Sequence, residues 1–354
     1  MKKALSFVLA VLLVFSLAGC GATASSQPAA EQTVVTDMIG REVTVNPGTY
    51  QRVVCIGAGA LRMYSYIGDV NLLCGVEDID NANSPNRPAM FDTVARPYAL
   101  AFGDVFSQLP SCGEGGPTAQ TAEAEKILSC NPDIVISEYE DVEKATALEE
   151  QLGIPVITLS VGTKGVFDEK FYGSMELLGK VFGQEEKAAK LTQFVKDEEA
   201  AITARVKDIA DADKPSVYVC GLGIQGIGPI EEEKFVELGE NMDVMILDAA
   251  AVKNIKPLFA EDPTMFDSCK AWQNGEIYLE MAYNAYYTNF EIALANTWFI
   301  AKTVYPEAFA DIDMTEKTNQ ITQAFLGMEL ADKIFACPAS YGGYQKIDTN
   351  TFFN

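Results

Sequence analysis

Histidine is absent from this sequence of 354 residues. Without it the chain has no Ser-His-Asp triad, no Cys-His dyad, no HExxH zinc site and no imidazole to ligate haem or a corrinoid. Carboxylates, lysines and tyrosines remain available for catalysis, but the 50 Asp and Glu residues show no spacing that marks an acid/base pair. We therefore expect a protein that is not an enzyme and that carries no cofactor or resident metal.

Basic residues are scarce. The chain has 26 Lys and Arg against 50 Asp and Glu, a formal net charge of −24. Such an excess repels nucleic acid and anionic lipid over most of the surface, so we expect no nucleic-acid partner. It says less about a small ligand, because a few arginines can reverse the field locally.

Paired cysteine motifs are also lacking. None of the eight cysteines belongs to a CxxC pair, and with one of them assigned to the N-terminal segment the other seven cannot all pair within the chain. Cys55 and Cys220 lie in apolar stretches that we predict to be strands, where a buried free thiol is expected. Unpaired thiols in an exported protein would suit a reducing or anoxic habitat.

Long apolar runs are limited to the N-terminus. Lys2 and Lys3 precede an apolar stretch too short for a comfortable membrane span, which ends in Leu-Ala-Gly before Cys20. This pattern is typical of a bacterial lipobox, with residues 1–19 as signal peptide, lipidation of Cys20 and a flexible tether over 20–32. The alternatives are an uncleaved anchor and an ordinary secretory peptide. We expect export and anchoring by lipid to the outer face of the cell membrane.

A helical pattern occupies the middle of the chain. Apolar residues recur every three or four positions in two runs, from Phe171 to Phe182 and from Gln184 to Ala210, with Gly183 as a stop between them. The second helix would span about 40 Å at about 1.5 Å per residue. One interpretation is a long surface helix on a single domain. We favour a stiff connection between two lobes, because strand and helix patterns restart on both sides.

The length after the tether supports two lobes. About 320 residues exceed the usual size of one hydrophobic core. The predicted organisation is an N-terminal α/β lobe over 33–168, connecting helices over 169–213 and a C-terminal α/β lobe over 214–354.

Short apolar runs alternate with helical patterns in both lobes. The first lobe has predicted strands at Glu42–Val45, Val53–Ile56, Leu72–Val76, Asp133–Ser137 and Val156–Leu159, helices at Thr118–Leu128 and Val142–Leu152, and a long loop at Asp78–Pro117. The second has predicted strands at Ser216–Cys220, Val244–Asp248 and Glu276–Glu280, helices at Asn289–Val304 and Thr315–Leu326, and a packed tail at Tyr341–Phe353. This alternation predicts Rossmann-like lobes with parallel sheets, which bind ligands beyond the carboxyl ends of their strands.

Several motifs carry a family resemblance. They are Thr36-Asp37-Met38-Ile39-Gly40-Arg41-Glu42-Val43, Arg52-Val53-Val54, Asn131-Pro132-Asp133-Ile134-Val135-Ile136, Asn274-Gly275-Glu276-Ile277-Tyr278, Tyr283-Asn284-Ala285-Tyr286-Tyr287-Thr288-Asn289 and Ala301-Lys302-Thr303-Val304-Tyr305-Pro306-Glu307. In this order, together with the lipobox, they resemble the solute-binding proteins of ABC importers for iron chelates and cobalamin. The resemblance implies two α/β lobes joined by one long helix. The last two motifs resemble a branch assigned to ferric siderophores and to molybdate or tungstate.

The resemblance also implies permease-docking residues. Glu125 falls where a related protein presents a glutamate at the tip of its first lobe, although an ordinary solvated helix residue is an equal interpretation. The second lobe departs from the family pattern, because only a shortened stretch separates Ile224 from Asp243. The equivalent glutamate would be Glu232 or one of its two neighbours, unless the lobe is trimmed.

Arginines and tyrosines near the predicted strand ends are the candidate ligand contacts. Arginine binds carboxylates and oxyanions through paired hydrogen bonds, whereas tyrosine stacks on aromatic chelates or ligates Fe(III). The predicted ligand-binding residues are Arg62, Arg96, Tyr98, Tyr139, Tyr283, Tyr286 and Tyr287. The alternatives are surface ion pairs for the arginines and core or hinge positions for the tyrosines. Glycine-rich segments at 113–116 and 221–228 would offer backbone N–H groups to an anion or serve only as turns.

The sequence thus predicts a lipoprotein that captures a ferric siderophore or similar metal chelate between its lobes. Its partners would be an ABC permease and the ATPase of that permease. Within the same class the alternatives are a molybdate or tungstate binder and then a corrinoid or haem binder. From a different class, a surface-anchored enzyme or a sensor ectodomain would use the same lobes.

Overall fold

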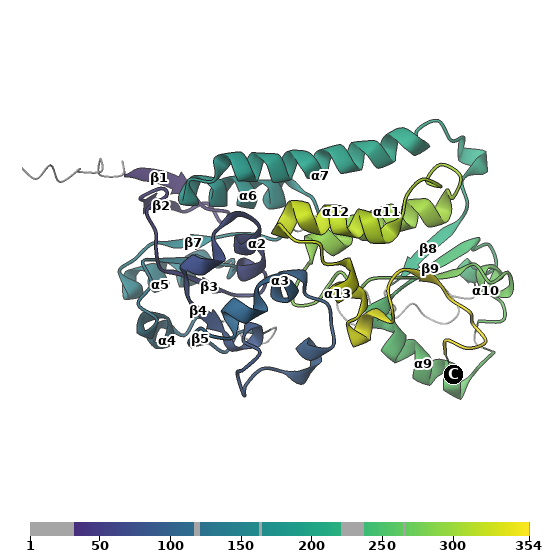
Figure 1. The fold of residues 1–354 in the computed structure, drawn as a ribbon, viewed down its shortest axis with the longest axis horizontal. Coiled ribbons are helices and arrows are strands. Elements are labelled where there is room, and N and C mark those ends of the chain that lie inside the picture. Colours follow the sequence, from purple (N-terminus) through teal and green to yellow (C-terminus); the bar gives the residue numbers. More distant parts are fainter. Residues whose placement is uncertain (1–31, 117–120, 163–164, 221–236, 265, 354) are drawn as a thin grey trace, which may run out of the picture. The chain divides into compact units, whose positions relative to one another are not determined.

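A computed structural model describes residues 32–116, 121–162, 165–220, 237–264 and 266–353 (Figure 1). Residues 32–354 group into one compact unit. The predicted boundaries at 168/169 and 213/214 stay predictions. Among the described residues, none of the helices combines the length and the hydropathy needed to cross a bilayer.

The first sheet is parallel and has five strands in the order β5-β4-β3-β6-β7. Its strands are β3 (Val53–Ile56), β4 (Leu73–Glu77), β5 (Ser111–Gly113), β6 (Ile134–Ser137) and β7 (Val156–Thr158). An antiparallel hairpin of β1 (Thr33–Thr36) and β2 (Glu42–Val45) precedes it. All residues of β3, β4 and β6 are buried, as expected for strands covered on both faces.

Helices connect these strands, and one of them corrects the sequence prediction. The connections contain α2 (Ala60–Ile67), α3 (Pro97–Phe106), α4 (Ala124–Ser129) and α5 (Val142–Leu152). The segment Asp78–Pro117, predicted as a long loop, holds both α3 and β5. The apolar residues of α3 occur almost without interruption, so its sequence shows little of the periodicity that marks a helix.

The predicted helix pair is present as α6 (Glu169–Phe182) and α7 (Glu185–Val206), which pack along each other (Figure 1). Asp168 caps α6 by accepting from two backbone N–H groups, and Gly183 ends it in the left-handed conformation, with a φ of 63°. Acidic residues occupy the first turn of α7, where the helix dipole favours them. The regular helix stops at Val206, four residues before the predicted end.

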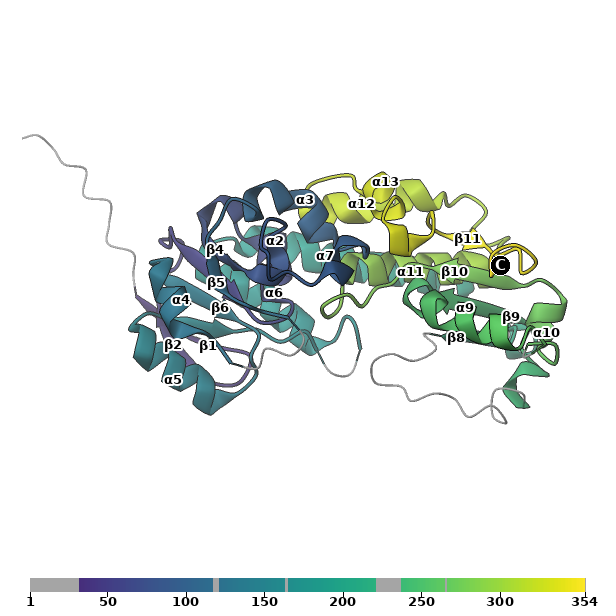
Figure 2. The ribbon, with the colours of Figure 1, turned by 90° about the horizontal axis from the view of Figure 1, so that it is seen from below.

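The second sheet has the order β11-β10-β9-β8. β8 (Val217–Cys220), β9 (Val244–Asp248) and β10 (Ile277–Glu280) are parallel, and β11 (Gln345–Lys346) is antiparallel at the edge. Side chains from α9 (Val252–Glu261) and α10 (Lys270–Gln273) pack on one face of this sheet, and those of α11 (Phe290–Val304) pack on the other. Figure 2 shows these helices around the sheet. The predicted tail packs here through Tyr341, Phe352 and Phe353.

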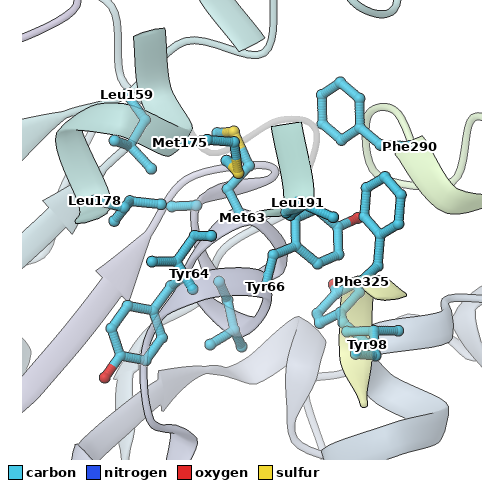
Figure 3. Close-up of a cluster of buried hydrophobic side chains, with 14 of the residues drawn as sticks. Met63, Tyr64, Tyr66, Tyr98, Leu159, Met175, Leu178, Leu191, Phe290 and Phe325 are labelled. Atoms are coloured by element: carbon cyan, nitrogen blue, oxygen red, sulfur yellow. The ribbon is translucent and has the colours of Figure 1, made fainter. Parts of the chain in front are cut away.

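One hydrophobic core continues from the first lobe into the second. It contains Tyr66 of α2, Phe290 of α11 and Phe325 of α12 (Met314–Leu326), which Figure 3 shows together. Phe171 of α6 belongs to the same core. The Tyr66 ring meets the Phe325 ring edge-on at 5.0 Å, and the Phe171 and Phe290 ring centroids are 4.5 Å apart. α13 (Ala331–Phe335) adds Ile334 to this core. The helices thus join the two lobes by shared apolar packing.

Candidate functional site

The carboxyl ends of β3 and β6 meet where the strand order of the first sheet reverses. β4 and β5 follow on one side of β3, whereas β6 and β7 lie on the other, and ligands of such sheets bind at this point. Gly57 follows β3 with a φ of 86°, and a Cβ there would lie 3.3 Å from the backbone N of Glu138, the first residue after β6. Glycine therefore allows the two loops to approach closely.

Arg62 lies in the first turn of α2, directly after this junction. Its side chain is fully buried, and its guanidinium carbon lies 4.9 Å from the centre of the Tyr98 ring. Nη2 donates to the carbonyl of Ala285 at 2.8 Å, whereas Nε and Nη1 are buried without a hydrogen-bond partner among the described residues. Two donors of a cationic group are thus available to a ligand.

Glu138 faces this arginine from the end of β6. Its side chain is 7% exposed, and Oε1 accepts from the backbone N–H of Val161 at 3.2 Å. The pKa of Glu138 is raised to about 8, mainly by burial and also by the nearby Glu140 carboxylate, while the charge of Arg62 opposes the rise. Near neutral pH Glu138 therefore includes a protonated form, which can donate a hydrogen bond as well as accept one.

The loop after β10 of the second lobe reaches this junction. Asn284 and Thr288 form an isolated antiparallel bridge, and between them Tyr286 and Tyr287 have φ values of 59° and 62°. Two consecutive aromatic residues in the left-handed region are strained, because their Cβ atoms crowd the backbone there. Contacts to the first lobe hold this conformation.

Tyr286 makes two of those contacts through its hydroxyl. Its hydroxyl donates to Oε2 of Glu77 at 3.1 Å and accepts from the backbone N–H of Gly116 at 2.9 Å. Its ring packs edge-on against Phe91 at 6.0 Å. Oε1 of Glu77 in turn accepts from the N–H of Gly57 at 3.0 Å. The side chain of Tyr286 thus links the second lobe to the loops after β3, β4 and β5.

The structure gives Arg96 and Tyr98 extensive partners within the first lobe. Arg96 donates to Asp80 at 2.6 Å and to the carbonyl of Ile79 at 3.0 Å, and its guanidinium stacks on Phe91 at 4.9 Å. Tyr98 is buried and its hydroxyl donates to the same Asp80 carboxylate at 2.6 Å. These contacts fix the Tyr98 ring against which the Arg62 guanidinium packs.

The remaining predicted tyrosines lie around the same loops. Tyr287 is 50% exposed, and a Cβ on Gly59 would lie 4.0 Å from its Cβ and 3.7 Å from Nη1 of Arg62. Tyr139 is half-buried and lies beside the Glu77 carboxyl, where burial raises its pKa. Tyr283 is half-buried on the second-lobe side. The structure therefore places both Tyr287 and Nη1 of Arg62 close to Gly59.

Two second-lobe carboxylates were missed by the sequence analysis. Asp248 and Glu280 are the last residues of β9 and β10 and are partners in the strand register. Both are buried, and both raise the pKa of Tyr283, after the larger effect of its burial. Their signal in the sequence was present, since each is an acid that closes an apolar strand at its carboxyl end. No group of three or more acidic or cysteine side chains in the described ranges is placed to hold a metal ion.

The predicted docking and anchoring residues are described only in part. Glu125 is exposed in the first turn of α4. Glu232 and Cys20 lie outside the described residues, as does the glycine-rich segment 221–228. The cysteines at positions 55, 74, 112, 130, 269 and 337 are free thiols, and the prediction of a buried free thiol at Cys55 is confirmed.

A pocket of about 510 Å³ lies at a different place in the first lobe. Its lining includes Arg41, Glu149 and Pro155. Pro155 directly precedes β7, so this pocket is at the amino ends of the strands rather than at the carboxyl ends. Arg41 is engaged there by Asp37 and Glu149. This pocket is therefore separate from the junction around Arg62.

Comparison with known families matches one segment of the chain. Residues 113–278 match the family model described as periplasmic binding protein. This match covers slightly less than half of the chain, which is similar to the family over that segment. Comparison with curated protein sequences found no match.

Several solved structures share the fold of this chain. A solute-binding protein from Veillonella parvula has 17% identity and a TM-score of 0.64, over 92% of this chain and all of that chain. The Haemophilus influenzae protein MolA with molybdate has 17% identity and a TM-score of 0.62, over 84% and 98%. Helicobacter pylori CeuE with nickel and histidine has 14% identity and a TM-score of 0.54, over 86% and 99%. The predicted fold class, with two α/β lobes joined by a helix, is confirmed.

Proposed function

We propose that this protein is the exported solute-binding lipoprotein of an ABC importer, and that it binds a metal chelate such as a ferric siderophore between its lobes. It delivers the chelate to a permease and catalyses no reaction. The proposal rests chiefly on Arg62, a buried guanidinium at the reversal point of a parallel sheet, two of whose nitrogens have no hydrogen-bond partner in the described part of the chain. The family match supports the transport role.

The surroundings of Arg62 favour a chelate over a bare oxyanion. Arg62 offers two charge-assisted hydrogen bonds to a carboxylate, hydroxamate or catecholate oxygen. Tyr287 adds an exposed aromatic ring beside it, whereas Glu138 and Glu140 add acidic groups on the same side. Carboxylates repel a small dianion such as molybdate, but a large ligand can direct only its electronegative atoms at Arg62.

A molybdate or tungstate binder is the second candidate within this class. The arginine and the turn Gly57–Gly59 would serve a tetrahedral oxyanion, and MolA, which shares the fold, was solved with molybdate. Corrinoid and haem binding follow in third place, because the chain supplies no histidine ligand. A surface-anchored enzyme or a sensor ectodomain remains the alternative of a different class.

The first test is thermal unfolding of purified residues 21–354 with ferric siderophores, cobalamin, haemin, molybdate and tungstate. A ligand at a hundred times its Kd adds about 2.7 kcal/mol to the free energy of unfolding, which a melting scan resolves. A rise in Tm with ferric chelates alone is the expected result. A rise only with molybdate or tungstate would replace the proposal by the second candidate, and hydrolysis of a supplied chelate would refute the absence of catalysis.

The second test replaces Arg62 by methionine, which keeps the apolar stem and removes the charge. The affinity for the chelate should fall by about 1.5 to 3 kcal/mol, the contribution of hydrogen bonds to a charged group. That loss is about ten- to a hundredfold in Kd. The control is Arg205→Lys, a site on α7 whose side chain pairs with exposed Asp311. Equal affinity in both variants would remove Arg62 from the binding site.

A further inference from the structure

Asp248 and Glu280 stand side by side at the carboxyl edge of the second sheet. They are register partners on adjacent parallel strands, which lie about 4.8 Å apart. Because side chains alternate along a strand, both point to the same face as Ile246 and Tyr278, the face covered by α11. The loop after β10 continues from Glu280 towards the first lobe, where Ala285 accepts from Arg62.

Neither carboxylate has a counter-ion among the residues that the structure describes. Asp248 is 7% exposed, and its Oδ1 accepts from the N–H of Ala250 at 2.6 Å. Glu280 is 4% exposed, and its Oε2 is buried without any hydrogen-bond partner. Burial raises the pKa of Asp248 to about 6 and that of Glu280 to about 8, and the charge of Asp248 adds to the second shift.

Such a pair is costly for the fold alone. A buried carboxylate without a partner is destabilised by several kcal/mol, and a second carboxylate beside it increases this cost. Asp248 has a local role because it caps the short helix that follows β9. Glu280 makes no such contact. A positively charged group that binds between the two side chains would offset the free energy that their burial costs the protein without ligand.

We propose that Asp248 and Glu280 form a subsite for a protonated amine of the transported ligand. This inference rests on the proposed function. An ammonium group has three donors and is satisfied by two carboxylates and one further acceptor or aromatic face. Tyr283 supplies that third contact, since it lies near enough for both carboxylates to raise its pKa. A metal ion would need four or more ligands, and the described residues offer no group of three acids or cysteines.

With this subsite the binding region has one cationic and one anionic contact site. Arg62 lies on the first-lobe side of the loop after β10, and the carboxylate pair lies on the second-lobe side, next to Tyr283. A chelate with electronegative metal-binding groups and a pendant amine would satisfy both. The two lobes would then recognise opposite ends of one ligand.

The test uses two ferric complexes that differ in one charge. Desferrioxamine B ends in a primary amine, and its N-acetyl derivative lacks that positive charge. Isothermal titration of purified residues 21–354 should show about tenfold tighter binding of the amine form, equivalent to about 1.4 kcal/mol. Equal affinities for both complexes would overturn the subsite and leave the proposed function standing. Binding of neither complex would overturn the subsite together with the ferric hydroxamate ligand class.

Isosteric variants locate the effect. The double variant Asp248→Asn, Glu280→Gln should lose the tenfold preference and keep the affinity for the acetylated complex. The control is Glu276→Gln, at the residue directly before β10, where the carboxylate pairs with Lys346. A double variant that still prefers the amine form would refute the assignment. If it does not fold, the comparison of the two complexes on the native chain decides the matter.

Discussion

Replacing Glu77 by glutamine should make the protein more stable at alkaline pH and leave it unchanged at acidic pH. Glu77 is 4% exposed and receives hydrogen bonds from Gly57 and Tyr286. Burial is the main cause that raises its pKa to about 7, against an ordinary value of 4.5. Glutamine matches the protonated carboxyl in size and in its ability to accept and donate.

The sign and size of the effect follow from the two pKa values. The folded protein holds the proton of Glu77 more tightly than the unfolded chain does, so the native state is favoured while the group is protonated. This contribution is complete below pH 4.5 and is lost as the pH rises through about 7. A rise from 4.5 to about 7 corresponds to about 3 kcal/mol, an upper bound because the native state relaxes around the charge.

The assay is urea unfolding of the wild type and of Glu77→Gln at pH 5 and at pH 8, in buffers of equal ionic strength. The two proteins should have similar free energies of unfolding at pH 5, and the variant should be about 1 to 3 kcal/mol more stable at pH 8. Glu138 and Glu280 titrate in the same direction in both proteins, so the difference isolates Glu77. A constant difference between the proteins at both pH values would refute the reasoning.

Two substitutions test packing between and within the lobes by urea unfolding. Tyr286→Phe removes two hydrogen bonds to the first lobe and should lower the free energy of unfolding by about 1 to 2 kcal/mol. The control Tyr287→Phe, at a half-exposed ring, should leave it unchanged. Equal effects of the two variants would show that these hydrogen bonds contribute nothing. Gly75→Ala would place a Cβ 2.5 Å from Sγ of Cys130 and should cost about 1 to 3 kcal/mol. The control is Gly103→Ala, where the added Cβ lies within a helix, meets no atom within 4 Å and should stabilise the protein. If Gly75→Ala left the stability unchanged, Cys130 would have to move aside.

Sequence patterns located most of the regular structure. The bounds of β3, α5 and β9 agree with their predictions, and Gly183 ends α6 as expected, because periodicity and punctuation by glycine act locally. α9 was missed because it contains Pro257, which argues against a helix when only the sequence is considered. Its Val252 and Ile255 are nevertheless buried against the second sheet, and this packing overrides the local preference.

The candidate site was predictable in its residue types and not in their partners. The strand-end rule placed Arg62 near a ligand, but its burial and its bond to Ala285 depend on a contact 223 residues away. The same rule, applied to acids as well as to arginines, would have found Glu280. The left-handed turn at Tyr286 has no local signal, because tyrosine there contradicts turn preference and is held by contacts to the first lobe.

The core shared by the two lobes determines how the protein loses its structure. Tyr66 and Phe171 have Phe290 and Phe325 as neighbours, so neither half of the chain buries all of its apolar surface by itself. The folded structure of one half therefore depends on that of the other, and we expect heating to unfold both in a single cooperative transition. A ligand held by either half protects the whole molecule, and a single melting curve records its binding.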